Sequence, residues 1–368
     1  MLAIEMLPGG HGDALVIEYG TRTDTRRVLV DGGTAHSWET VRERLKALPE
    51  RRFEAMVVTH VDEDHIGGSL QVLADPDLRH RVRDIWFNGF VHCERGGSVL
   101  GPVDGERLTK RINDGPFRWN DQFDNRISAK VGGPVVVSSR AEELPKIELP
   151  GGAIVHLLSP TGSKLTKMAL EWKTVVEEAG LVPGQGTPLE ARTFPPSDEP
   201  VEPLPDELTT GLLEKMGAPS RPDPSEANGS SIAFIFEFDG RRALLGADAH
   251  ADVLMESLAK YGKAKGEKRV RLDLVKLPHH GSKGNVTSEL INAIDAKRYL
   301  ISTNGDSHGH PDHGAIARTI LSSSRPPTFY CNYRSVHTEP WVERAPDVGA
   351  KFVLPRPGKS GLRVSATA

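Results

Sequence analysis

Short apolar runs rich in β-branched residues recur along the first part of the chain, and each predicts a buried strand. These predicted strands cover Ala14 to Tyr19, Arg27 to Val30, Ala55 to Val58 and Asp84 to Phe87. A helical pattern follows the second run over Ser37 to Leu48, where apolar residues share one face and Pro49 ends the pattern. Strand and helix signals therefore alternate from the start.

The second half of the chain repeats this alternation. Strands are predicted at Ala153 to Leu158, Ser231 to Phe238, Arg242 to Leu245, Leu272 to Lys276 and Arg298 to Ser302. Helices are predicted at Ala249 to Tyr261, Thr287 to Ile294 and His313 to Ser322. The two-residue turn Asp239-Gly240 predicts a hairpin, which requires antiparallel pairing. We therefore expect mixed sheets covered by helices and not a purely parallel sheet.

Prolines and acidic residues crowd together between Gly180 and Asn228. Proline removes backbone donors and fixes φ, so regular structure is not expected over most of this stretch. We predict a single domain over residues 1–368, with a flexible, exposed, proline-rich insertion at residues 181–227.

Composition argues against several classes of protein, although it does not exclude a nucleic-acid substrate. The 368 residues include 46 Lys and Arg against 50 Asp and Glu, so no basic surplus points to nucleic acid or an anionic membrane. Cys93 and Cys331 are too few for a disulfide framework, so any metal must be bound by His and carboxylates. The chain start lacks a basic, apolar leader and no long apolar run follows, which predicts a cytoplasmic protein without a membrane segment.

Candidate metal ligands are densest in His60-Val61-Asp62-Glu63-Asp64-His65, directly after the predicted strand Ala55 to Val58. A loop at a strand end is a common place for a functional site, and imidazole with carboxylate suits Zn²⁺, Mn²⁺ or Fe²⁺. The alternative is a solvated polar turn or a helix cap. Further ligand types at two later strand ends favour a metal site.

Those later segments are Gly246-Ala247-Asp248 and Pro278-His279-His280-Gly281. Taken alone, Asp248 would most simply cap a helix beginning at Ala249. Paired histidines at a strand end have few structural uses, so ligation is favoured, although one of the two could merely orient the other.

The order of these motifs, preceded by Asp31-Gly32-Gly33, resembles the metallo-β-lactamase superfamily. Within it, the chain is most similar to the soluble hydrolase domain of ComEC, the competence DNA-uptake channel. This closer resemblance rests on Gly10-His11-Gly12-Asp13-Ala14, Asn228-Gly229-Ser230-Ser231-Ile232 and Gly309-His310-Pro311. The resemblance implies an α/β fold, an αββα sandwich of two mixed sheets with the proline-rich insertion added.

The resemblance also implies two divalent ions, Zn or Mn, and assigns their ligands. His60 and Asp62 would bind the first ion and Asp64 and His65 the second, with Asp248 between them. His279 or His280 would complete the second site, and the family pattern favours His280. Residues expected to hold the ligands in place from behind are Asp31, Asp13 and Asn228.

Two departures from the family pattern affect the first ion. Asp62 stands where most members have His, and Asn228 stands where a further His is usual. A hard carboxylate shifts metal preference toward Mn²⁺ or Mg²⁺. The first site is therefore expected to be the weaker one.

Two ions with a metal-bound hydroxide suit hydrolysis of phosphodiesters, esters or lactams, and the resemblance favours a phosphodiesterase or nuclease acting on single-stranded DNA or a nucleotide. Asp64 and His310 are the expected catalytic residues, and His308 or His310 would be the proton donor. The alternatives for the segment Ser307 to His313, which holds three histidines, are a further metal site and a solvated loop before the helix at His313. Lys283 and His308 are expected to contact substrate, although both could be ordinary solvated side chains. The rivals are a small-molecule ester, thioester or lactam hydrolase, and a metal-stabilised interaction module that binds partner proteins through the insertion.

Overall fold

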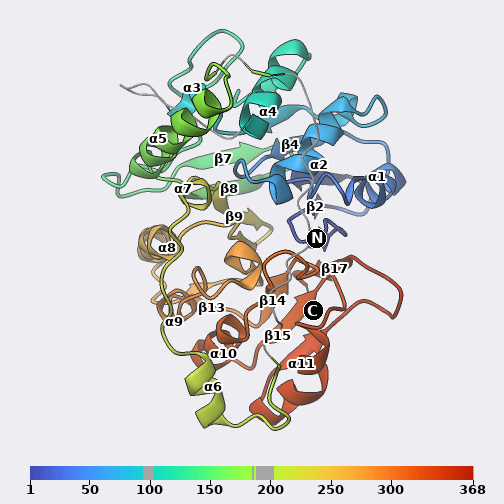
Figure 1. Cartoon of the computed structure of the whole chain (residues 1–368), viewed down its shortest axis with the longest axis vertical. Coiled ribbons are helices and arrows are strands. Elements are labelled where there is room, and N and C mark those ends of the chain that lie inside the picture. Colours follow the sequence, from blue (N-terminus) through green and yellow to red (C-terminus); the bar gives the residue numbers. More distant parts are fainter. Residues whose placement is uncertain (94–102, 185, 188–202, 368) are drawn as a thin grey trace.

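Two large mixed β-sheets form the centre of the computed structural model, which describes residues 1–93, 103–184, 186, 187 and 203–367 (Figure 1). The first sheet contains β1 (Leu2–Met6), β2 (Leu15–Gly20), β3 (Thr25–Val30), β4 (Phe53–Val57), β5 (Asp84–Trp86), β6 (Arg118–Trp119) and β17 (Leu362–Ser365). The second contains β7 (Lys146–Leu149), β8 (Ala153–Ser159), β9 (Ala233–Phe238), β10 (Arg241–Leu245), β12 (Leu274–Lys276), β14 (Arg298–Ile301), β15 (Thr328–Cys331) and β16 (Lys351–Val353). A small separate pair joins β11 (Val270–Arg271) to β13 (Ile294–Asp295).

The strands that precede the predicted ligand segments, β4, β10 and β12, lie inside the two sheets and not at their edges. The first sheet runs β17-β1-β2-β3-β4-β5-β6 and the second runs β16-β15-β14-β12-β10-β9-β8-β7. β1 pairs antiparallel with β17, so the first and last strands are neighbours. β3, β4 and β5 are parallel to one another, as are β10, β12 and β14. Because carboxyl ends of parallel strands meet at one sheet edge, the loops after β4, β10 and β12 lie at such edges.

The faces of the strands follow from their two-residue period. Along β2, Leu15, Ile17 and Tyr19 belong to the core between the two sheets. Val16, and Ala14 just before the strand, pack against the helices on the outside. A strand buried on both faces is expected to read as a continuous apolar run, which is what this segment shows.

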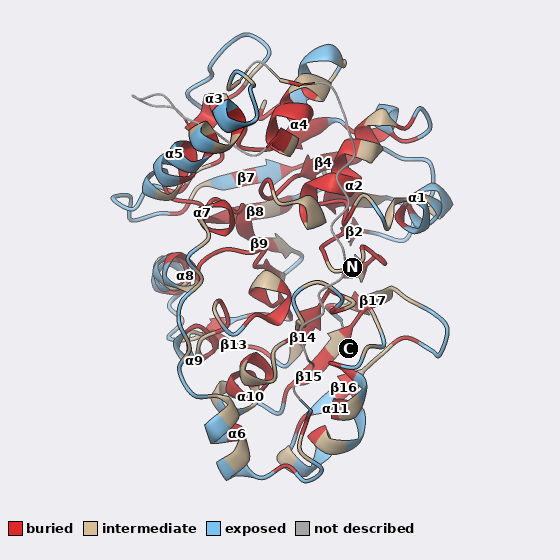
Figure 2. Cartoon of the chain, in the orientation of Figure 1, coloured by how far each residue is buried: buried red, intermediate tan, exposed pale blue. Residues whose placement is uncertain are grey.

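Helices cover the outer faces of both sheets, and each has a buried side and an exposed side (Figure 2). They are α1 (Trp38–Ala47), α2 (Glu63–Ala74), α3 (Phe90–Cys93), α4 (Val103–Asp114), α5 (Gly162–Glu178), α6 (Thr210–Met216), α7 (Glu226–Gly229), α8 (Ala251–Lys265), α9 (Ser288–Asn292), α10 (His313–Ser322) and α11 (Glu339–Arg344). Among the helices in the described ranges, none has both the length and the apolar character needed to cross a bilayer.

The predicted fold class is confirmed, and so are the predicted strands, each within a few residues of its expected bounds. The antiparallel hairpin of β9 and β10 is confirmed as well, with Asp239 and Gly240 in the left-handed region at φ 51° and 69°. One local expectation is wrong: Asp64 and His65 lie in the first turn of α2 and not in a loop. α8 begins at Ala251 with His250 as its N-cap, which removes the alternative that Asp248 caps this helix.

The proline-rich segment, residues 181–227, contains more regular structure than its composition predicts. α6 lies within it, and α7 begins near its end. Its two ends are held by buried charged side chains. Glu106 of α4 accepts hydrogen bonds from the backbone N–H groups of Gly184 (2.7 Å) and Gly186 (2.8 Å). Near the other end, Arg318 of α10 donates to the carbonyls of Gly217 and Ala218. Flexibility of the segment stays a prediction, and residues 185 and 188–202 lie outside the described residues.

Candidate metal centre

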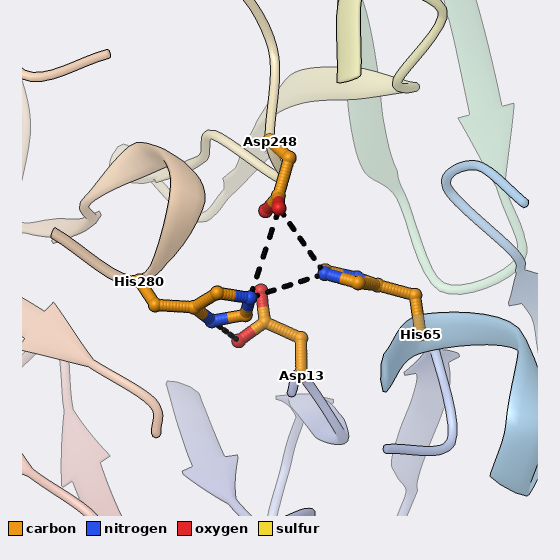
Figure 3. A group of neighbouring side chains, drawn as sticks. All are labelled: Asp13, His65, Asp248 and His280. Carbon is orange, nitrogen blue, oxygen red and sulfur yellow. Dashed lines mark hydrogen bonds and ion pairs between the residues drawn. The ribbon is translucent and has the colours of Figure 1, made fainter. Parts of the chain in front are cut away.

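Four side chains from distant parts of the chain converge beyond the ends of the central strands (Figure 3). Asp13, His65, Asp248 and His280 are all buried, and each offers one ligand atom within 4.8 Å of those of the other three. His65 comes from α2, Asp248 from the turn after β10, and His280 from the 3-10 turn Pro278–Gly281 after β12. Segments separated by more than 200 residues therefore meet at one point.

The spacing of the ligand atoms fits a small divalent cation. The Nε2 atoms of His65 and His280 are 3.2 Å apart, and Asp248 Oδ2 lies 3.4 Å from the first and 3.7 Å from the second. A tetrahedral site with metal–nitrogen distances of about 2.0–2.1 Å has ligand–ligand edges of roughly 3.3 Å. Asp64 Oδ2 adds a fourth candidate atom, 3.2 Å from His280 Nε2 and 3.7 Å from His65 Nε2.

Both histidines are oriented by acceptors on their far sides. His65 Nδ1 lies 2.8 Å from Asp31 Oδ2, and His280 Nδ1 lies 2.8 Å from the carbonyl oxygen of Ser302. These acceptors place the ring proton on Nδ1 and leave the Nε2 lone pair free for a cation. Asp31 also accepts from the backbone N–H and the hydroxyl of Thr59, both at 2.8 Å. The expected position of Asp31 behind the ligands is the one that the structure has.

Close packing of Gly32 against Gly68 explains how Asp31 reaches His65. A Cβ on Gly32 would lie 2.1 Å from the backbone nitrogen of Ser69, and one on Gly68 would lie 2.0 Å from the carbonyl oxygen of Gly32. Only glycine permits this approach of a loop to α2. Asp31 itself adopts φ 56°, which turns its carboxylate toward the helix. The local sequence Asp31-Gly32-Gly33 thus sets the distance to His65.

The paired histidines point in different directions. Both lie in the left-handed backbone region, at φ 46° for His279 and 53° for His280, so the chain turns sharply between them. His280 points into the centre. His279 Nε2 lies 3.7 Å from Asp248 Oδ2, while its Nδ1 lies 2.8 Å from Asn285 Oδ1 and 3.3 Å from Asp223 Oδ2. The geometry therefore favours His280 as the ligand and places His279 beside the carboxylate.

Electrostatics at the centre also favour a bound cation. Although burial opposes its charged form, the carboxylates of Asp248 and Asp13 raise the pKa of His280 to about 9. Burial likewise disfavours ionised Asp248, yet His65 and His280 hold the pKa of Asp248 well below its usual range. Buried carboxylates are costly unless they are paired with a cation. Histidines that are drawn toward protonation in this way mark a site with an excess of negative charge.

Asp13 is close enough to join the ligands but is already engaged. Its Oδ2 accepts from the ammonium of Lys276 at 2.6 Å, and Lys276 is fully buried. Burial raises the pKa of Asp13, but the charges of Lys276 and His280 outweigh this effect and lower it to about 2. Its Oδ1 lies 3.5 Å from His280 Nδ1, the nitrogen that faces away from the other ligands. These contacts place Asp13 on the far side of the His280 ring, and its supporting role stays a prediction.

The first predicted site is less complete. His60 Nε2 lies 3.5 Å from Asp62 Oδ2, and the His60 ring is 4.3 Å from that of His65. The buried His60 Nε2, Asp248 Oδ1 and Asn228 Oδ1 have no hydrogen-bond partner among the described residues. Those atoms could serve a second ion. Asn228 also donates to Asp223 Oδ2 at 2.7 Å, which supports the loop as expected. His60, Asp62 and Asp64 all lie outside the group of four that Asp13, His65, Asp248 and His280 form.

The other predicted site residues surround the centre at different distances. His310 packs against His279 with ring centroids 5.1 Å apart, and His308 lies 6.0 Å from His310 and is exposed. Burial lowers the pKa of His310, so its neutral form dominates near neutral pH, which weakens the case for a proton donor. Lys283 is largely exposed, and its ammonium lies 3.5 Å from Asp312 Oδ1. Among the described residues, the histidines at positions 308, 310 and 313 form no group with the spacing that a metal ion requires.

Two residues of the site were missed in the sequence. Asp223 lies in the proline-rich segment, yet its carboxylate accepts from Asn228 (2.7 Å) and Asn285 (3.0 Å) beside His279. His11 lies 6.4 Å from His308, ring to ring, and near enough to Asp64 and His280 for their charges to affect its pKa, which burial lowers. The Gly10-His11-Gly12-Asp13 motif drew attention to His11 without giving it a role. No local signal distinguishes Asp223 from the other acids between prolines.

The chain is similar in sequence to known proteins. The family model described as metallo-beta-lactamase superfamily matches residues 7–305. A stretch of 107 residues is 26% identical to ComE operon protein 3 of Bacillus subtilis (strain 168). That stretch is 29% of this chain and 13% of the relative, so most of the relative lies outside the match.

Solved structures resemble the chain more loosely. CmlA, a diiron beta-hydroxylase from Streptomyces venezuelae, is 12% identical with a TM-score of 0.41, over 99% of this chain and 54% of that one. The metallo-beta-lactamase fold protein YhfI from Bacillus subtilis is 10% identical with a TM-score of 0.36, over 99% of both chains. Similarity at these levels says nothing about which reaction the present chain performs.

Proposed function

Because the chain belongs to the metallo-β-lactamase superfamily, we propose that it is a metal-dependent phosphodiesterase acting on single-stranded DNA or a small nucleotide. The family match confirms the resemblance seen in the motifs, and members of this superfamily are typically metal-dependent hydrolases. The observation that carries the proposal is the convergence of His65, His280 and Asp248 with a second carboxylate, Asp64, at the spacing of a divalent-cation site.

The residues present fit a divalent cation. Two imidazole Nε2 atoms with fixed tautomers face two carboxylates in a buried centre, and His60 Nε2 and Asp248 Oδ1 have no hydrogen-bond partner among the described residues. Bound ions would lower the pKa of a water molecule and neutralise charge on the attacked group. We expect His65, His280, Asp64 and Asp248 to hold the stronger ion, and His60, Asp62 and Asp248 the weaker. The identity of the metal, Zn or Mn, belongs to the proposal.

A carboxylate-rich centre favours phosphodiesters over lactams. Asp62, Asp64 and Asp248 are hard oxygen ligands, which suit ions that also bind phosphate oxygens. On the substrate side, Lys283 can contribute positive charge, and the neutral imidazole of His310 can contribute a hydrogen bond. Both are contacts that an uncharged lactam needs less.

The proposal is tested by turnover. Purified chain loaded with Mn²⁺, Mg²⁺ or Zn²⁺ is assayed on bis-p-nitrophenyl phosphate, a single-stranded oligonucleotide and a chromogenic β-lactam. We expect the phosphodiesters to be cleaved fastest with Mn²⁺. Asp64→Ala, His65→Ala and Asp248→Ala should each abolish turnover and reduce metal content by elemental analysis. His80→Ala is the matched control, because the side chain of His80 is 54% exposed and lies on a different turn.

Each other outcome has a defined meaning. Full metal occupancy and full turnover in all three ligand variants would reject the site. Faster lactam or thioester turnover would replace the phosphodiesterase with a small-molecule hydrolase. A filled site without turnover of any substrate would leave the interaction module, with partner binding through residues 181–227.

A further inference from the structure

A cavity of about 430 Å³ lies at the edge of the second sheet opposite to the metal centre, and its lining is strongly basic. Six of the residues around it are basic and two are acidic, so the lining carries four more positive than negative charges. They are Arg241, Arg242, Arg271, Lys297, Arg298 and Arg325, with Glu267 and Asp273. The whole chain has a net charge of -4, so this local surplus runs against the average.

The position of the cavity follows from strand direction. Arg241 and Arg242 begin β10, Arg298 begins β14, and Lys297 directly precedes it. Asp248 lies six residues after Arg242, at the other end of β10, which places the cavity roughly 20 Å from the metal centre. The two sites therefore lie at opposite ends of the same strands and cannot share one small ligand.

Half of the basic side chains are neutralised by the protein itself. Arg241 pairs with Asp273 at 3.0 Å, Arg242 with Glu267 at 2.9 Å, and Arg325 with Asp295 at 2.7 Å. These pairs fix the guanidinium groups in place, and they explain the arginines without any ligand. Taken alone they indicate only a well-ordered surface.

The other three cations lack a committed carboxylate. Arg298 donates to the carbonyl oxygen of Ser365 at 2.7 Å and has no acidic partner in the described chain. Arg271 is 3.7 Å from Glu267, which is already bound twice by Arg242. No hydrogen bond or ion pair with any described residue engages the ammonium of Lys297. Like charges held together in this way repel one another, so an anion that enters the cavity gains their combined attraction.

We propose that this cavity binds a phosphate-bearing ligand with at least two negative charges. Guanidinium groups offer forked donors that match phosphate oxygens, and several of them around one cavity require more acceptor oxygens than a single carboxylate supplies. A volume of about 430 Å³ admits a ligand of nucleotide size. The proposal does not depend on the hydrolase activity, since no residue of the cavity belongs to the metal centre.

The test is calorimetric titration of the whole chain with inorganic tripolyphosphate, in excess EDTA so that no ion remains at the metal centre. We expect saturable binding that Lys297→Glu weakens about tenfold or more. Lys263→Glu makes the same change in net charge at a side chain that is 78% exposed on α8, and it should leave binding unchanged. Because Lys297 and Lys263 make few contacts, neither variant should unfold, which thermal unfolding checks. Arg271→Ala should also weaken binding.

A second arm distinguishes the sources of phosphate. A six-nucleotide oligothymidylate that binds with a steep salt dependence, and is weakened by Lys297→Glu, would identify a nucleic-acid backbone as the ligand. Binding of tripolyphosphate alone would identify a small free anion. The proposal is overturned if neither probe binds saturably, or if Lys297→Glu and Lys263→Glu lose the same affinity.

Discussion

Replacing Asp31 by Asn should disable the metal centre without removing a metal ligand. The Asp31 carboxylate is fully buried and accepts three hydrogen bonds, one of them from His65 Nδ1. Asparagine has a single acceptor oxygen. If that oxygen keeps the backbone N–H of Thr59, the amide nitrogen faces His65 and can only donate. His65 must then accept on Nδ1, which moves its proton to Nε2 and removes the lone pair that faces Asp248 and His280.

The size of the effect follows from comparable contacts behind metal ligands. Loss of such a partner typically costs 10- to 100-fold in metal affinity, or about 1.4–2.7 kcal/mol. The variant should also unfold more easily, because hydrogen bonds to a charged acceptor contribute about 1.5–3 kcal/mol each.

Competition against a chromophoric chelator measures the Kd for Zn²⁺ or Mn²⁺, and urea unfolding of the metal-free chain measures stability. Asp84→Asn is the control. Asp84 is also buried in the first sheet, where it accepts from Trp86 Nε1 at 3.0 Å. This variant should keep its metal affinity. A Kd for Asp31→Asn within twofold of the wild type would refute the tautomer argument.

Three further predictions concern pH and the proline-rich segment. The pKa of His280 is raised to about 9 in the folded, metal-free chain, so its contribution to the free energy of unfolding is fully present below pH 6.5 and is lost as the pH rises through 9. In urea unfolding, EDTA-treated protein should lose on the order of 3 kcal/mol of stability across that window. Metal-loaded protein should not show this loss. Arg318→Met leaves buried carbonyls without donors and should destabilise the chain by about 3 kcal/mol. The proline-rich segment should then be cleaved faster by proteases. Arg356→Met, at an exposed site, should change neither the stability nor the rate of cleavage. Asp223→Ala should keep the metal content but lower kcat, because His279 loses a charged partner at 3.3 Å; an unchanged kcat would show that this contact is irrelevant to turnover.

The sequence predicts most of the fold because the buried strands are continuous apolar runs, and such runs are visible without any structure. It fails at α2 for a physical reason. Gly67 and Gly68 are poor helix formers, and here each allows another segment to approach closely: Gly68 lies against Gly32, and Gly67 against the backbone nitrogen of Ala35. Helix propensity alone therefore predicts a loop after β4. In the structure, packing against the neighbouring loop allows α2 to begin there, so that the helix contains Asp64 and His65.

The candidate site shows the same division. Asp248 and the paired histidines are visible because ligand residue types end apolar strands. The choice between His279 and His280 is not, since it depends on two consecutive residues with positive φ, which side-chain chemistry does not encode. The position of Asp223 depends on contacts between segments about 60 residues apart, and no pattern within its own segment reports them.

Arg318 joins three parts of the chain that the order of the sequence keeps apart. It donates to carbonyls of Gly217 and Ala218 on one side and of Lys283 and Val286 on the other. The loop from Lys283 to Val286 directly follows the paired histidines. An engineer who shortens the segment before Ser220, or a relative that has lost it, must supply a new partner for this guanidinium or accept a disturbed histidine loop. The segment that interrupts the fold is for this reason not free to vary in length independently of the chemistry.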